Sequence, residues 1–192
     1  MASFYFNYGA MDSSKSASLL MVAHNYESKN MKVLLLKPSI DTKEEDYIIS
    51  RIGLKRKADY LIGDKFEEEF EKQFDLNEYS CILVDEAQFL KRKDVDYLDF
   101  LKYKYDIPII CYGLRLDFAE ELFDGSARLL AIADKISEIK TVCACGKKAT
   151  RNIRLINGKV VFEGDKVLID NNDKVEYVSV CSKCYKDMKN GI

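Results

Sequence analysis

Residues 4–16 read FYFNYGAMDSSKS, a short aromatic and apolar segment followed by a loop and the start of an amphipathic segment. Phe4–Tyr8 has the composition of a strand, and residues 15–29 carry apolar side chains at helical spacing. The loop between them matches the phosphate-binding pattern G-x-x-x-x-G-K-[ST] except at Ser14, where the pattern has glycine. We therefore predict a nucleotide-phosphate site formed by Gly9, Ala10, Met11, Asp12, Ser13, Ser14, Lys15 and Ser16.

The chemistry of such a loop explains these residue types. Its backbone N–H groups point at a phosphate from the N-terminus of a helix, and the lysine neutralises phosphate charge. The hydroxyl of Ser16 would bind Mg²⁺. The alternative interpretation is a serine-rich loop with a solvated lysine.

Three further apolar runs indicate a buried parallel sheet. Met31–Leu36, Cys81–Val84 and Ile107–Tyr112 are almost continuously apolar, which is typical of strands that are covered by helices on both faces. The segments Asp64–Phe74 and Asp94–Tyr103 are the expected covering helices. The sequence therefore predicts an α/β domain.

Two carboxylates directly follow one of these runs. Asp85 and Glu86 come after Val84, at the end of the strand where open α/β sheets bind ligands. Asp85 would hold Mg²⁺ there, and Glu86 would take a proton from an attacking hydroxyl group. An ordinary acidic loop is the alternative, and the phosphate-binding pattern in the same chain favours the first interpretation.

Four of the six cysteines form two closely spaced pairs near the C-terminus. Cys143-x-Cys145 and Cys181-x-x-Cys184 suit a closed, tetrahedral Zn²⁺ site, which is structural and not catalytic. A set of reduced thiols without a metal is the alternative.

The segment between the cysteine pairs differs in character from the rest of the chain. It is rich in β-branched residues, and Asn157-Gly158 lies between apolar runs, which is the pattern of a β-hairpin. We therefore predict two domains, an α/β domain over residues 1–140 and a zinc-binding domain over residues 141–192.

The composition excludes several classes of protein. The chain has 192 residues and a net charge of −2, with 30 Lys and Arg against 32 Asp and Glu. It therefore lacks the basic surplus of nucleic-acid or membrane-surface binders, and it is too short for an ATP-driven nucleic-acid motor. No apolar run approaches the ~20 residues that span a bilayer, and the N-terminus has no export-signal pattern. We expect a cytoplasmic protein that binds neither nucleic acid nor membrane.

Together, these motifs resemble the thymidine kinases of animal cytosol and of bacteria, particularly their enterobacterial branch. The resemblance extends from the phosphate loop to Tyr185, and its most specific segments are residues 85–89 (DEAQF), 111–118 (CYGLRLDF) and 177–181 (YVSVC). It implies a RecA-like P-loop sheet with helices on both faces and a small zinc-ribbon-like lasso domain. It also implies transfer of the γ-phosphoryl group of ATP to the 5′-hydroxyl of thymidine, and possible acceptance of deoxyuridine.

The resemblance assigns roles to individual residues. Glu86 is the general base, Ser16 and Asp85 hold Mg²⁺, and the four paired cysteines hold Zn²⁺. Besides the phosphate loop, the residues expected at ATP are Arg51, Asp85, Glu86 and Gln88. The residues expected at the nucleoside are Met11, Phe89, Leu114, Phe118, Leu168, Ile169 and Tyr177. Arg154 matches a basic position near the phosphates or the lasso. The resemblance further implies a homotetramer and feedback inhibition by dTTP.

The chain departs from the family pattern at three places. Ser14 replaces a glycine, Ala119 stands where relatives often have arginine, and residues 169–172 (IDNN) replace Ile-Gly-Gly in a lasso that is about two residues longer. Because the carboxylates Asp85 and Glu86 are intact, we expect an active kinase with altered kinetics. The alternative is a nucleotide- or nucleoside-binding regulatory module in which Ser14 has abolished turnover.

Overall fold

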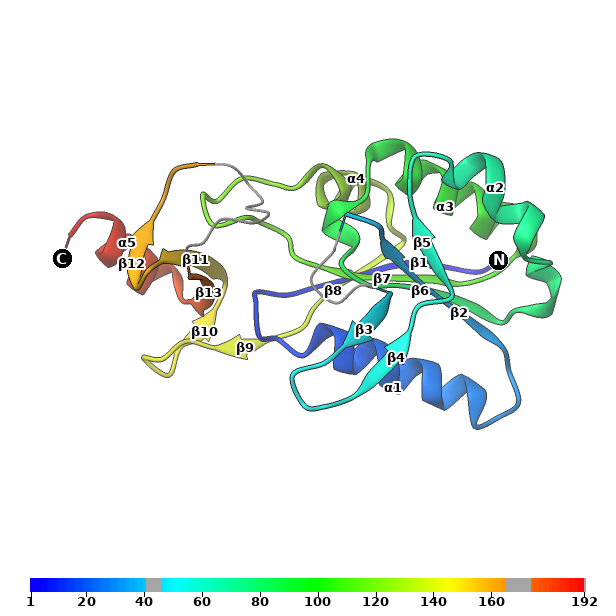
Figure 1. Ribbon diagram of the computed structural model, residues 1–192, viewed down its shortest axis with the longest axis horizontal. Helices are drawn as coiled ribbons and strands as arrows, with labels where there is room; N and C mark the ends of the chain where they lie inside the picture. Colours follow the sequence, from blue (N-terminus) through cyan, green and yellow to red (C-terminus); the bar gives the residue numbers. More distant parts are fainter. Residues whose placement is uncertain (41–45, 165–173, 192) are drawn as a thin grey trace.

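The computed structural model describes residues 1–40, 46–164 and 174–191. Its centre is a six-stranded sheet in the order β5-β2-β6-β7-β1-β8, in which every pair of neighbours is parallel (Figure 1). The strands are β1 (Phe4–Tyr8), β2 (Val33–Pro38), β5 (Tyr60–Ile62), β6 (Cys81–Val84), β7 (Ile109–Gly113) and β8 (Lys135–Glu138). The predicted parallel sheet is therefore confirmed.

Helices cover both faces of this sheet, as expected. Figure 1 shows α1 and a small hairpin on one side, and α2, α3 and α4 on the other. The helices are α1 (Lys15–Glu27), α2 (Phe66–Gln73), α3 (Arg92–Tyr105) and α4 (Asp124–Ile132), with short 3₁₀ turns η1 (Leu76–Glu78) and η2 (Ala87–Phe89). The hairpin consists of β3 (Tyr47–Ile49) and β4 (Lys55–Lys57).

Alternating side chains of the central strands supply two separate cores. In β2, Leu34 and Leu36 pack in the cluster that contains α2 and α3, whereas Val33 and Leu35 pack with α1. Successive strand side chains point to opposite faces, so a strand with helices on both sides needs apolar residues at every position. This is the physical reason that the continuous runs indicated a parallel sheet.

The C-terminal part forms its own small sheet, which lies at one end of the molecule (Figure 1). The order is β12-β11-β13, with all pairs antiparallel. Its elements, with the preceding two-stranded ribbon, are β9 (Thr141–Val142), β10 (Lys148–Ala149), β11 (Arg151–Ile156), β12 (Lys159–Val161), β13 (Val175–Val180) and α5 (Ser182–Lys189). Asn157 and Gly158 join β11 to β12 with φ of 51° and 79°, the two positive values of a type I′ turn. The predicted hairpin is confirmed.

Several elements were not predicted from the sequence. β3, β4 and β5 have only three residues each, too few to show a periodicity. β8 has the polar sequence KISE and is mostly exposed at the edge of the sheet, and α4 begins with Asp-Gly-Ser, which favours a turn. β1 and β6 have the predicted bounds, and the other predicted elements differ from the observed ones by a few residues at their ends.

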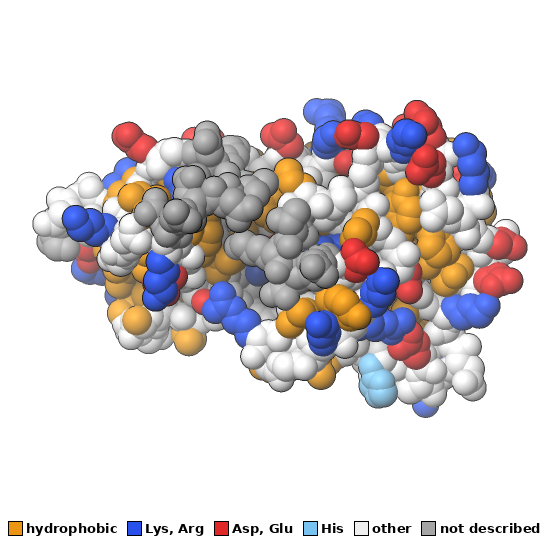
Figure 2. Space-filling view, in the orientation of Figure 1, with side chains coloured by type: hydrophobic (Ala, Val, Ile, Leu, Met, Phe, Trp, Pro, Cys, Tyr) orange, Lys and Arg blue, Asp and Glu red, His pale blue; other side chains and the backbone are white. Residues whose placement is uncertain are grey.

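The outer surface carries mixed charge. In the view of Figure 2, Lys and Arg side chains alternate with Asp and Glu side chains. Ion pairs such as Lys32–Glu78, at 2.6 Å, and Lys148–Glu138, at 2.7 Å, join opposite charges. Within the described ranges, none of the helices is both long enough and apolar enough to span a membrane.

Candidate active site

The predicted phosphate and carboxylate residues meet at the carboxyl ends of the central strands. The phosphate loop follows β1, Asp85 and Glu86 follow β6, and Leu114 follows β7. Because these three strands are parallel neighbours in the sheet, their carboxyl ends lie together, where α/β sheets bind ligands.

Lys15 is buried within the phosphate loop. Its Nζ donates to the backbone oxygen of Ala10 at 2.9 Å and to Oγ of Ser13 at 3.4 Å. Burial lowers the pKa of Lys15, and the negative charges of Glu86 and Asp85 oppose this shift. The lysine therefore lies in the field of both carboxylates, close to the residues predicted to bind Mg²⁺ and to act as the base.

The loop requires glycine at its first position but accepts serine at its sixth. A Cβ atom on Gly9 would lie 2.6 Å from the backbone oxygen of Ile139. Ser14 adopts φ 59° and ψ 31°, the left-handed conformation that glycine favours, and its side chain is exposed. The backbone path therefore suits the glycine of the pattern although a serine is present, and nothing in the described part of the chain favours the regulatory alternative.

One carboxylate oxygen of Asp85 is buried without a hydrogen-bond partner in the described part of the chain. The residue is 4% exposed, and its Oδ1 has no hydrogen-bond partner among the described residues. Burial and the charge of Glu86 raise the pKa of Asp85 to about 7, against a hydrogen bond from the Ser16 side chain that lowers it. A buried carboxylate oxygen without a partner is costly, and it fits a bound cation. Carboxylate and hydroxyl oxygens are donors that suit Mg²⁺.

Glu86 is held by the side chain of Gln88. Gln88 is 2% exposed, and its Nε2 donates to Oε2 of Glu86, while its Oε1 accepts from the backbone N–H of Leu114 at 2.9 Å. Glu86 itself has φ 48°, an uncommon conformation for a residue with a side chain. The amide of Gln88 is thus joined to the predicted base, and its expected place at ATP remains a prediction.

Two glycines allow the turn at residues 86–89 to be packed closely on both sides. A Cβ on Gly113 would lie 2.7 Å from Oε1 of Gln88, and a Cβ on Gly125 would lie 2.6 Å from the backbone oxygen of Ala87. The ends of β7 and α4 therefore touch the turn directly. This packing fixes the backbone from which Glu86 projects.

Three of the residues predicted to enclose the nucleoside, Phe89, Leu114 and Phe118, lie in the segments that follow β6 and β7. Phe89 packs edge-on against Phe123, with ring centroids 5.7 Å apart, and Leu114 and Phe118 are buried. Tyr177 lies on β13, opposite Arg154 of β11. Leu168 and Ile169 fall outside the described residues, so their predicted backbone contacts with the base remain a prediction.

Asn152 is a site residue that sequence reasoning missed. Its Oδ1 accepts from the backbone N–H of Met11 at 2.8 Å, and its Nδ2 donates to the backbone oxygen of Leu116 at 3.1 Å. It is 4% exposed. One amide from β11 therefore joins the phosphate loop to the segment after β7, and no local sequence motif marks it.

Arg51 lies at the phosphate loop, paired with one of its residues. Its guanidinium forms an ion pair with the carboxylate of Asp12, and its side chain is 70% exposed. The guanidinium is therefore placed beside the loop and is open to solvent. Its contact with a phosphate remains a prediction.

The four paired cysteines form a compact cluster. The sulfur atoms of Cys143, Cys145, Cys181 and Cys184 all lie within 4.8 Å of one another, and those of Cys145 and Cys181 are 3.6 Å apart. A tetrahedral Zn²⁺ with Zn–S distances of about 2.3 Å separates its sulfur ligands by about 3.8 Å. The cluster therefore fits a tetrahedral metal ion.

The environment of the cluster lowers the pKa of two of its thiols and raises that of a third. Backbone hydrogen bonds from Cys145 and Cys181 lower the pKa of Cys143 to about 6, and a backbone hydrogen bond from Cys184 lowers the pKa of Cys181. Hydrogen bonds with the neighbouring sulfurs raise the pKa of Cys184 to about 12. By contrast, Cys81 and Cys111 are buried in the central sheet, and burial raises the pKa of Cys81 to about 12, so they behave as apolar core residues.

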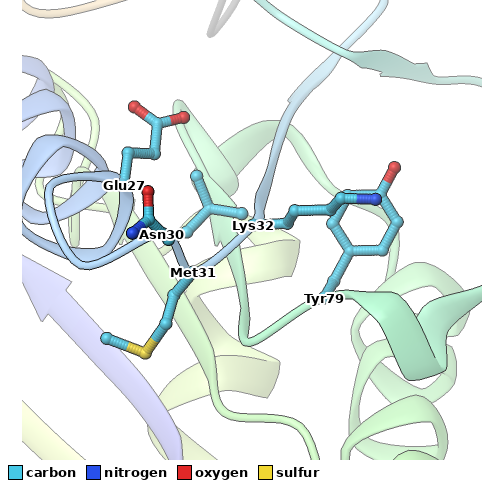
Figure 3. A pocket seen from close by; sticks show the side chains of 6 residues that line it. Glu27, Asn30, Met31, Lys32 and Tyr79 are labelled. Atoms are coloured by element: carbon cyan, nitrogen blue, oxygen red, sulfur yellow. The ribbon is translucent and has the colours of Figure 1, made fainter.

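A separate hollow of about 350 Å³ lies at the opposite end of the strands, where β2 begins (Figure 3). Its lining residues are Glu27, Asn30, Met31, Lys32, Val33 and Tyr79. It contains none of the predicted site residues.

Comparisons with known proteins agree with this site. The family model described as thymidine kinase matches residues 2–185. The chain is 47% identical over 191 residues to a thymidine kinase of Enterobacteria phage T4, covering 98% of this chain and 97% of that protein. It is 44% identical over 190 residues to one from Shewanella oneidensis, covering 97% and 98%, and 43% identical over 187 residues to one from Streptococcus gordonii, covering 96% of each. The chain therefore belongs to the thymidine kinase family.

Proposed function

We propose that this protein is an ATP-dependent thymidine kinase, which transfers the γ-phosphoryl group of ATP to the 5′-hydroxyl of thymidine and yields dTMP and ADP. The observation that carries the proposal is the meeting of Lys15, Asp85 and Glu86 at the carboxyl ends of the parallel strands, within a chain of this family. Deoxyuridine is proposed as a second acceptor, since it differs from thymidine only by the methyl group of the base.

Phosphoryl transfer needs positioning and charge neutralisation more than covalent chemistry. Glu86 is proposed to accept the proton of the 5′-hydroxyl group. The hydroxyl oxygen then forms a bond with the γ-phosphorus, and the bond between that phosphorus and the leaving ADP oxygen breaks. Lys15 would leave the oxygen of Ala10, its present acceptor, and donate to the phosphates. Arg51, which lies beside the loop, would also donate to the phosphates.

Mg²⁺ is proposed to bind through Ser16 and Asp85. When it is bound, the ion neutralises charge on the phosphate oxygens. The unpartnered Oδ1 of Asp85 supports this assignment, because a cation would satisfy it.

The nucleoside is proposed to lie between apolar side chains from four segments. A neutral pyrimidine suits an apolar slot with a few oriented hydrogen bonds. The proposed lining residues are Met11, Phe89, Leu114, Phe118 and Tyr177, with backbone groups of Leu168 and Ile169.

We further propose that residues 141–192 form a lasso domain, distinct from a kinase domain over residues 1–140, and that Zn²⁺ on the four cysteines anchors it. The family resemblance supports a cytoplasmic homotetramer and inhibition by dTTP. These proposals are tested by sedimentation of the purified protein, and by rate measurements with dTTP added.

The central test is thymidine phosphorylation with ATP and Mg²⁺. Glu86→Gln should lower kcat by about 10²- to 10⁴-fold, and Lys15→Ala should raise the KM for ATP and lower kcat. Matched controls are Glu78→Gln and Lys32→Ala, which remove a surface ion pair at the opposite end of the strands and should leave turnover unchanged. A wild-type protein that binds thymidine without phosphorylating it would instead indicate the regulatory module.

A further inference from the structure

The ring of Phe118 is covered by a buried guanidinium from the other sheet. Arg154, on β11, places its guanidinium carbon 3.6 Å from the centroid of the Phe118 ring. Phe118 is 2% exposed and Arg154 is 1% exposed. A planar guanidinium that lies over an aromatic face is held there by cation–π attraction, which is strongest when both groups are desolvated. The contact therefore restricts the tilt of the Phe118 ring.

The main chain of Phe118 is held by a residue beside the cysteine cluster. Tyr185 donates from its Oη to the backbone oxygen of Phe118 at 2.9 Å, and this hydrogen bond is buried. Tyr185 lies on α5 directly after Cys184, and its ring packs edge-on against Phe162 at 5.4 Å. The cluster and the backbone of Phe118 are thus joined through a single side chain.

The guanidinium of Arg154 also binds the main chain. Its Nη2 donates to the backbone oxygen of Glu163 at 2.9 Å. A Cβ on Gly164 would lie 2.8 Å from the same nitrogen, so glycine allows this close approach. The guanidinium is therefore held between the Phe118 ring and the main chain that follows β12.

The burial of this charge needs an explanation. Taking a guanidinium out of water is unfavourable, and an apolar side chain of similar volume would fill the space without that cost. What an apolar side chain lacks is a flat, charged face with directed N–H groups. The arrangement thus gives the Phe118 ring a defined orientation.

We propose that Arg154 and Tyr185 are positioning residues that set the orientation of Phe118 for the nucleoside base. The proposal rests on the proposed function, in which Phe118 encloses thymine. Both residues act through Phe118: Arg154 fixes the ring and Tyr185 fixes the backbone. The C-terminal sheet and α5 thereby contribute to nucleoside affinity.

The test compares Arg154→Lys and Tyr185→Phe with the wild type. The first keeps the charge without the planar face, and the second removes only the hydroxyl group. Each should raise the KM for thymidine about five- to tenfold, the loss expected for one buried contact. The kcat at saturating thymidine and the KM for ATP should change less than about twofold, and the zinc content should stay as in the wild type.

Two control variants test whether the loss of a contact elsewhere in the molecule has the same effect. Tyr97 lies on α3 and donates a hydrogen bond of 3.1 Å to Glu71 of α2. Tyr97→Phe removes this hydrogen bond. Arg56→Lys alters an ion pair with Glu27, at 2.5 Å. Both should leave the KM for thymidine unchanged.

A spectroscopic measurement keeps the proposal testable if the variants lose stability. In protein carrying 4-fluorophenylalanine at position 118, Tyr185→Phe should shift or broaden the fluorine resonance, and Tyr97→Phe should not. An unchanged thymidine KM in both main variants, or an unchanged resonance, overturns the proposal.

Calorimetric titration with thymidine in the absence of ATP separates this proposal from the proposed function. If the wild type binds thymidine without turnover, and the variants bind it more weakly, the kinase assignment fails and the positioning roles stand. If the wild type phosphorylates thymidine and the variants match its KM, only the positioning roles fail.

Discussion

The side-chain oxygen of Gln88 accepts a hydrogen bond of 2.9 Å from the backbone N–H of Leu114, and this contact determines which end of the amide faces Glu86. Because the oxygen is occupied by a donor, the NH₂ group is turned towards the carboxylate. The amide therefore holds the Glu86 carboxylate in one position, which a general base needs in order to reach its proton.

Replacing Gln88 with leucine should therefore lower kcat. The variant leaves the Glu86 carboxylate without its donor and the N–H of Leu114 without its acceptor, and we expect kcat to fall by about 10- to 100-fold. The KM for ATP should change little.

The control for this prediction is Gln73→Leu, at an exposed position at the end of α2. Its kinetics should match the wild type. A Gln88→Leu enzyme whose main defect is a raised KM for ATP would show that Gln88 serves the nucleotide, as the sequence suggested.

The left-handed conformation of Ser14 predicts opposite effects for two substitutions. Ser14→Gly should keep turnover and raise the free energy of unfolding by up to about 1 kcal/mol, because glycine adopts this conformation without steric cost. Ser14→Val should lower it by about 1 kcal/mol or more and raise the KM for ATP, since a β-branched residue is poorly tolerated there. Thermal unfolding and ATP kinetics measure both effects.

Asn30→Gly is the matched control, because Asn30 has φ 59° far from the phosphate loop. Asn30→Gly should raise the free energy of unfolding and leave the ATP kinetics unchanged. If Ser14→Gly weakens ATP binding, the serine side chain itself takes part in binding, and the conformational explanation is wrong.

The cysteine cluster predicts close to one equivalent of zinc in freshly purified protein. Cys143→Ser removes one of four thiolate ligands, so zinc should be lost, and the C-terminal sheet should become susceptible to proteolysis. Metal analysis and limited digestion give the readouts. Cys81→Ala, in the core of the central sheet, should retain the metal. Wild-type protein without bound metal would contradict the assignment.

Gly125→Ala reverses the usual effect of alanine in a helix. Alanine normally stabilises a helix relative to glycine by about 0.5–1 kcal/mol. Here the added methyl group would meet the backbone oxygens of Ala87 and Leu90 at 2.6 and 2.7 Å. We expect a loss of about 1–3 kcal/mol together with a lower kcat, because the turn that carries Glu86 must shift.

Gly63→Ala is the comparison for this variant, since its added methyl group would meet only Oγ of Ser39, at 3.6 Å. Its kcat should be that of the wild type. An unchanged Gly125→Ala enzyme would show that the turn tolerates displacement.

The parallel sheet could be predicted because its central strands are apolar at every position, and this follows from having helices on both faces. The Asn157-Gly158 turn could be predicted because few other residue pairs adopt two positive φ values. The phosphate loop and the cysteine pairs were recognisable because each concentrates its chemistry in a few neighbouring residues.

Asn152, Gly113 and Gly125 could not be identified in this way. Their importance comes from what the fold brings beside them: the N–H of Met11 for Asn152, and the turn at residues 86–89 for the two glycines. The left-handed conformation of Glu86 likewise has no local signal in the sequence. Long-range contacts of this kind arise only once the strands are in register.

The position of β1 in the sheet has a consequence for how the chain matures during synthesis. β1 leaves the ribosome before the other strands of this sheet, yet it pairs with β7 and β8, which begin at Ile109 and Lys135. Pairing across such a distance along the chain is slow and must await the later segments. The strand that leads into the phosphate loop therefore cannot be fixed until most of the chain has emerged, so a nascent or truncated chain that ends before β7 should have no affinity for nucleotide.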